Sequence, residues 1–165
     1  MTSGLPFPLI PVAPIVVGAL GFVLVLVALL FFLRQRKSRQ PRHEQLYRQA
    51  WEKDPAERTE AEQLCFDAQS LHLYLTAGGL DGGIGNMGED EVRRALPALK
   101  VLGLESVAQE ISAFLEIYEA MVGIGDMDQE TTDEYFETEK QVHQRIAYDL
   151  RDIPNRLDRY LAKVG

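Results

Sequence analysis

The chain has 165 residues, a formal net charge of −8 at pH 7 and a single cysteine. Its charge is uneven, because the first 42 residues carry five Lys or Arg and no acid, whereas residues 43–165 carry 12 basic and 25 acidic side chains. The strongly acidic part excludes direct nucleic-acid binding as an expected function, since proteins bind phosphates through clustered Lys and Arg. The lone Cys65 excludes an internal disulfide, which is typical of a domain in a reducing compartment. It lies in a helical pattern and is predicted to be a small core residue rather than a nucleophile.

An uninterrupted apolar segment occupies residues 15–33, with the sequence IVVGALGFVLVLVALLFFL. As a helix at about 1.5 Å per residue it would extend roughly 28 Å, close to the thickness of bilayer hydrocarbon. The segment is followed by five cations, Arg34, Arg36, Lys37, Arg39 and Arg42. The segment is therefore predicted to be a transmembrane helix, and the lipid bilayer is its predicted partner.

The flanking charges predict the topology. Residues 1–14 carry no charged side chain, and the five cations all lie after residue 33. The positive-inside rule then predicts a single-pass protein of the bacterial inner membrane with its C-terminal part in the cytoplasm. The expected parts are an extracytoplasmic N-terminus (1–14), a transmembrane helix (15–33), a basic linker (34–43) and an acidic helical domain (44–165).

Residues 44–165 have the periodicity of helices nearly throughout, and no stretch alternates as a strand does. Capping boxes are predicted at Thr59 with Glu62, at Ser106 with Gln109 and at Thr131 with Glu134. Further helices are expected over 44–53, from near Glu89 and after Pro154, with Pro97 marking a kink or break. The positions predicted to face inward include Tyr118, Val122, Phe136 and Val164. The expected fold is an all-α domain of five or six helices.

A glycine-rich segment, GGLDGGIGNMG, covers residues 78–88 and is predicted to be a loop after a helix that ends near Ala77. We expect Gly78 or Gly79 to adopt positive φ there, and Gly78, Gly79 and Asn86 are the candidate motif residues. The G-x-G-x-x-G match within it lacks a preceding strand, and three acids follow it, so dinucleotide binding is not expected. Whether the loop is structural or binds a ligand stays open, and an enzyme of unknown reaction centred on it is an alternative function.

A second alternative is a calcium site. Asp126, Asp128, Glu130 and Glu137 occupy positions 1, 3, 5 and 12 of an EF-hand-like loop. Thr131 stands at position 6, where the sharp turn needs glycine. The start of a capped acidic helix explains the same residues, so we expect no metal and no other cofactor.

The stretch LYLTAGGLDGGIGNMGEDEVRRALPALKVLGLESVAQEI resembles the bacterial domain-of-unknown-function family that includes a DNA-mimic protein. The matching positions are Gly78, Gly79, Asn86, Ala98, Leu99, Leu102 and Gly103. Ala77 stands where the family usually has Asn, and Leu80 stands where it has an aromatic residue. The resemblance implies an acidic all-α domain without established enzymatic chemistry and allows a homodimer.

Eleven acids and no base lie between Glu105 and Glu139. The candidate interaction face comprises Glu105, Glu110, Glu116, Glu119, Glu130, Asp133, Glu134 and Glu137. One helical strip would carry a charge per about 5 Å against one per roughly 1.7 Å in duplex DNA, so mimicry needs adjacent helices or a second subunit. The sequence predicts a membrane-anchored, non-enzymatic interaction module for a basic or nucleic-acid-binding protein, and a face that serves solubility alone is the alternative.

Overall fold

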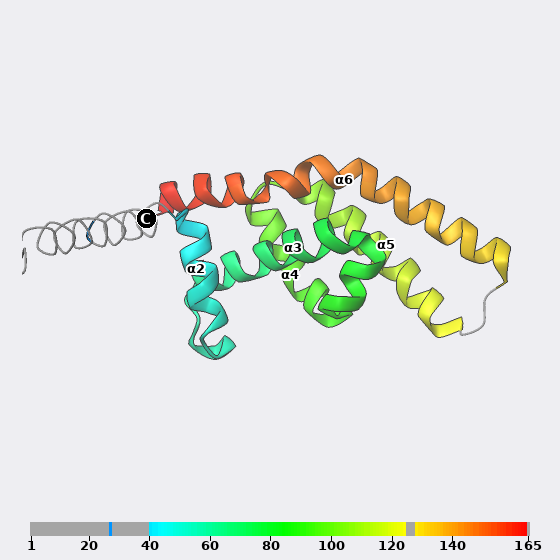
Figure 1. Ribbon diagram of the computed structural model, residues 1–165, viewed down its shortest axis with the longest axis horizontal. Helices are drawn as coiled ribbons and strands as arrows, with labels where there is room; N and C mark the ends of the chain where they lie inside the picture. The colour runs from blue at the N-terminus through cyan, green and yellow to red at the C-terminus, as the bar shows by residue number, and fades with distance from the viewer. Residues whose placement is uncertain (1–26, 28–39, 125–127, 165) are drawn as a thin grey trace, which may run out of the picture. The chain divides into compact units, whose positions relative to one another are not determined.

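The computed structural model describes residues 27, 40–124 and 128–164 and divides the chain into two compact units, Met1–Gln40 and Pro41–Gly165. The second unit contains five α-helices and one 3-10 helix among its described residues (Figure 1): α2 (Arg42–Trp51), η1 (Pro55–Glu57), α3 (Glu60–Met87), α4 (Glu89–Val101), α5 (Glu105–Ile124) and α6 (Gln129–Val164). These residues contain no strand, so the all-α prediction is confirmed for them.

The predicted transmembrane helix, residues 15–33, lies outside the described residues except for Val27. Among the described residues, no helix combines the length and apolar character that a membrane crossing requires. Two residues before residue 44, the predicted start of the domain, contact α6. The guanidinium of Arg42 donates to the carbonyl oxygen of Leu161 at 3.1 Å, and Nδ1 of His43 lies 2.8 Å from Oδ1 of Asp158, so both residues belong to the helical unit.

The core lies around α3, which packs against α2, α4 and α6. Its largest fully buried side chains come from four helices: Leu71, Leu75, Leu80, Ile84, Leu99, Ile111, Phe114, Leu115, Leu150, Ile153, Leu157 and Leu161. Cys65 is fully buried among them, as the helical pattern predicted. Burial raises the pKa of its thiol to about 12, so the thiol stays protonated at neutral pH.

One of the three predicted capping boxes is present in the structure. Thr59 accepts from the amide of Glu62, and the Glu62 carboxylate accepts from the amide of Thr59 at 2.9 Å. The boxes at Ser106 and Thr131 are wrong, because α5 begins at Glu105 and α6 at Gln129. The first turn of α6 is instead closed by Asp128, whose Oδ1 accepts from the amide of Thr131 at 2.8 Å.

Two prolines were predicted to interrupt helices, but neither of them ends one. Pro97 lies inside α4 and Pro154 lies inside α6, which continues for 36 residues. A proline leaves the carbonyl four residues before it without an amide donor, and for Pro154 that carbonyl belongs to Leu150. Nδ1 of His72 lies 2.8 Å from the Leu150 carbonyl oxygen, so an α3 side chain supplies the missing donor.

Three residues that were predicted to face inward are exposed. The exposed fractions are 62% for Val122, 51% for Phe136 and 59% for Val164. In α6 the inward position is taken by Tyr135, one residue and about 100° around the helix from Phe136. The apolar pattern therefore identified the helical class correctly but misplaced the inward face near the ends of the helices.

Candidate functional site

The glycine segment is a kink in α3 and continues as helix to Met87, so the prediction of a loop over 78–88 is wrong. Gly79 has φ 71° and ψ −168°, which confirms the expected positive φ. This backbone conformation is essentially restricted to glycine. The amide that follows it, on Leu80, donates to Oε1 of Glu139 in α6 at 2.8 Å, so the second half of α3 begins with a carboxylate cap.

The glycines on both sides of the kink let two backbone segments approach closely. A Cβ atom added to Gly83 would lie 2.8 Å from the carbonyl oxygen of Tyr74, and one added to Gly78 would lie 3.0 Å from the nitrogen of Gly83. Asn86 donates from Nδ2 to the carbonyl oxygen of Gly82 at 2.6 Å. Gly78 and Gly79 thus form the kink, whereas Asn86 lies about two turns farther along the second half of α3.

A second contact ties the kink to α6. The hydroxyl of Tyr135 donates to Oδ1 of Asp81 at 2.6 Å. Burial, together with the Asp81 carboxylate, raises the pKa of Tyr135 well above its usual range. Tyr135 therefore stays protonated at neutral pH and serves as a donor that holds α6 against the kink.

The acidic residues of the candidate face differ in their pairing. Arg145 donates from Nη2 to Glu110 at 2.8 Å, and Arg93 donates from Nη2 to Oε2 of Glu119 at 2.6 Å. The hydrogen bond from Arg145 lowers the pKa of Glu110. The charges of α5 are therefore partly neutralised by neighbouring helices, which the run of acids in the sequence did not indicate.

The exposed and least neutralised acids gather in the first turns of α6, where Glu130, Asp133, Glu134 and Glu137 lie. At 100° per residue these four positions fall within a sector of about 100° on the side opposite Tyr135. Glu137 contacts Lys140 at 3.3 Å, and no ion pair involves the other three within the described residues. We call these four residues the acidic end of α6.

The last turns of α6 have a net positive charge, since residues 151–163 hold four cations against Asp152 and Asp158. They carry Arg151, Arg156, Arg159 and Lys163, which we call the basic end of α6. At 1.5 Å per residue the members of the two ends are separated by about 21 to 50 Å along one helix (Figure 1). Acids near an N-terminus and bases near a C-terminus complement the helix dipole, so this polarity also stabilises α6 itself.

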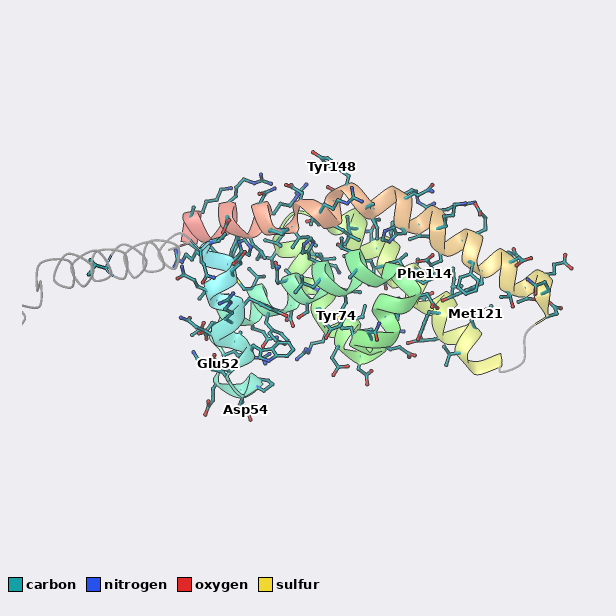
Figure 2. All side chains as sticks on the ribbon, in the orientation of Figure 1. Glu52, Asp54, Tyr74, Phe114, Met121 and Tyr148 are labelled. Atoms are coloured by element: carbon teal, nitrogen blue, oxygen red, sulfur yellow. The ribbon has the colours of Figure 1, made fainter. Side chains whose placement is uncertain are left out.

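An aromatic side chain lies on the outward face of α6 between the two ends. Tyr148 is 82% exposed and points away from the neighbouring helices (Figure 2). It follows Glu137 by eleven positions, so it lies about 16 Å along the helix and only about 20° away around it. Tyr148 and the acidic end therefore face the same direction.

The geometry does not favour the calcium alternative. Asp128 immediately precedes α6, and Glu130 and Glu137 lie within that helix, which places Asp128 about 13 Å from Glu137 along the axis. Calcium ligands lie 2.3–2.6 Å from the ion, so these residues cannot share one. Asp126 lies outside the described residues, within which no cluster of His, Cys, Asp and Glu could hold a metal ion.

A groove between η1, α3 and α4 has a volume of about 400 Å³. Its charged lining residues are Arg58, Glu60, Asp67 and Arg94, and none of its lining residues is His, Cys or Ser. Burial raises the pKa of the Asp67 carboxyl, although Gln63 and Arg94 oppose the shift. The groove offers a buried acid beside two guanidinium groups, and its lining holds no paired nucleophile and base.

No family model, curated protein or solved structure matches this chain. The resemblance to the family with a DNA-mimic member therefore stays a prediction. Sequence reasoning missed the roles of His72, Arg93 and Glu139, because each acts on a residue at least 26 positions away. Pro154 is the local sequence signal that could have indicated the contact of His72, because a proline inside a helix leaves a carbonyl oxygen without its amide donor.

Proposed function

We propose that this chain is a membrane-anchored, cytoplasmic interaction module whose acidic end recruits a protein with a basic surface. The observation that carries the proposal is the outward face of α6, where four exposed acids and the 82% exposed Tyr148 point the same way. Complementary charge speeds encounter, and an exposed tyrosine is a common anchor at protein interfaces.

The partner chemistry follows from the charge density at this end. Four acids lie within eight residues, so adjacent charges are about 3.5 Å apart along the axis. This density is higher than the average over the whole run and closer to the roughly 1.7 Å spacing of duplex DNA. A basic, nucleic-acid-binding protein is therefore a fitting partner, with DNA mimicry limited to the short acidic end.

The test begins with crosslinking of the full-length protein in its native membrane to identify the partner. Association is then measured with Glu130→Lys, Glu134→Lys and Glu137→Lys combined, and separately with Tyr148→Ala. The triple reversal should slow association, and raised salt should weaken the wild-type complex, because a Debye length of about 8 Å screens exposed charges. Tyr148→Ala should weaken binding by about tenfold or more if it is an anchor.

A matched control reverses three exposed acids elsewhere: Glu52, which follows α2, Glu57 in η1 and Glu60 in α3. This variant changes the net charge by the same amount but leaves the outward face of α6 intact. A partner whose binding tolerates high salt, the α6 reversal and Tyr148→Ala alike would refute the proposal. Equal loss in the control and the α6 reversal would show that net charge, rather than this face, matters.

A further inference from the structure

A second surface with a different chemistry lies at the basic end of α6. A pocket of about 260 Å³ lies between the end of α4 and the end of α6, lined by Val101, Leu102, Arg156, Arg159, Tyr160 and Lys163. Three of these six residues are cations and none is an acid. The lining therefore carries three positive charges, which attract an anion, although Asp149 and Asp152 pair with Arg156 and Arg159 and offset part of this charge.

The three cations differ in their hydrogen-bonding partners. The guanidinium of Arg156 donates to the carbonyl oxygens of Leu102 and Gly103 and to the carboxylates of Asp149 and Asp152. These bonds hold the end of α4 against α6 and form the wall of the pocket.

Arg159 and Lys163 retain donors for a ligand. Arg159 uses one nitrogen for Asp152 at 3.0 Å, and its side chain is 62% exposed. Lys163 is exposed and has no ion pair within the described residues. The two lie four positions apart on α6, so their side chains are neighbours on one face.

The chain enters the helical unit beside the last turns of α6, the segment that also carries the cations of the pocket. Arg42 contacts the carbonyl of Leu161, and His43 contacts Asp158. Arg42 follows Leu33 by nine residues, which extend at most about 30 Å. If residues 15–33 span a membrane, as the proposed function requires, this tether keeps the basic end near the lipid headgroups.

We propose that this pocket binds the phosphate of an anionic phospholipid headgroup in the membrane that holds the anchor. Arg159 and Lys163 supply the charge-assisted hydrogen bonds, and Arg156 positions the wall. A lipid fits better than free inorganic phosphate, because Val101 is 52% exposed and offers an apolar surface beside the cations. Binding would orient the domain with its acidic end directed away from the bilayer.

The test uses the full-length chain in vesicles of neutral phosphatidylcholine, with or without anionic phosphatidylglycerol, and hydrogen exchange of the last turns of α6. Anionic lipid should slow exchange there by about 30-fold, the effect expected of two cations near an anionic surface. Arg159→Gln combined with Lys163→Gln should abolish this protection. The control Arg48→Gln with Lys140→Gln removes two exposed cations that lie outside the basic end and do not line the pocket, and it should keep most of the protection.

The remaining arms separate the sources of phosphate and the two proposals. Equal protection by inorganic phosphate in neutral vesicles would overturn the lipid as ligand, and equal loss in both double variants would overturn the pocket in favour of general surface attraction. No protection by anionic lipid would also overturn it. Flotation with neutral vesicles reports the anchor alone. If the protein does not float with neutral vesicles, the proposed function is refuted. The pocket is then tested separately by flotation with anionic vesicles. Arg159→Gln combined with Lys163→Gln must abolish that flotation.

Discussion

Nδ1 of His72 lies 2.8 Å from the carbonyl oxygen of Leu150, the carbonyl that Pro154 deprives of its helical amide. A carbonyl can only accept, so this contact places the imidazole proton on Nδ1. One side chain from α3 thus repairs the hydrogen-bonding ladder of α6 and lets a single helix carry both the acidic and the basic end.

A double-mutant cycle tests this repair. His72→Phe should lower the free energy of unfolding by about 1 kcal/mol or more, because it leaves the Leu150 carbonyl without a donor. In a Pro154→Ala background the amide of residue 154 can bond that carbonyl, so the same substitution should cost less. Chemical denaturation of the four proteins measures the difference. Strictly additive effects would mean that the histidine and the proline act independently.

Gly79→Ala should destabilise the domain by about 1–3 kcal/mol, because the φ 71°, ψ −168° conformation is essentially open to glycine alone. The added Cβ would also lie 2.7 Å from Oε1 of Glu139. Gly82→Ala is the matched control, since a Cβ there meets nothing within 4 Å, and it should be neutral or stabilising. Thermal denaturation compares the melting temperatures of the two variants. Equal melting temperatures would contradict the requirement for glycine at the kink.

The two neighbouring acids Glu137 and Glu139 should respond differently to substitution. Glu139→Ala removes the acceptor for the Leu80 amide and should cost about 1 kcal/mol of unfolding free energy. Glu137→Ala removes an exposed contact with Lys140 and should change stability by about 0.5 kcal/mol or less. Urea denaturation compares them. Similar losses would mean that Glu139 is only part of the solvated face.

The capping box gives the domain a defined acid sensitivity. Hydrogen bonds from Lys53 and from the Thr59 amide lower the pKa of Glu62 from 4.5 to about 2. A lowered native pKa contributes stability above the unfolded value, and this contribution is lost as the pH falls from about 4.5 to about 2. The stability difference between wild type and Glu62→Gln should therefore shrink over this range. A difference independent of pH would show that the Glu62 charge contributes nothing to folding.

The predicted topology has its own test. A reporter fused after Gly165 should be active only in the cytoplasm, because the five cations after Leu33 are retained there. Arg substituted for Leu24, in the middle of the predicted span, should cost about 2.5–3.5 kcal/mol of insertion free energy and lower membrane retention. Activity of the reporter on the extracytoplasmic side, or unchanged fractionation of the variant, would contradict a spanning helix.

Local sequence signals predicted a large part of the fold. The helical class, the capping box at Thr59, the burial of Cys65 and the positive φ of Gly79 follow from periodicity and from the steric limits of individual residues. Signals of this kind act within about four positions, so a single sequence carries them directly. The acidity of the candidate face was equally visible, because charge depends on composition alone.

Only the tertiary structure decided which acids are available and where the helices end. Glu110, Glu119 and Glu139 looked like members of one free strip, but Arg145, Arg93 and the Leu80 amide engage them from other helices. Pro154 was predicted to precede a separate helix, but α6 continues through it and His72 donates to the carbonyl of Leu150. Each of these contacts joins residues that are 26 or more positions apart, and their distance in space is set by packing around α3, which local sequence patterns do not encode.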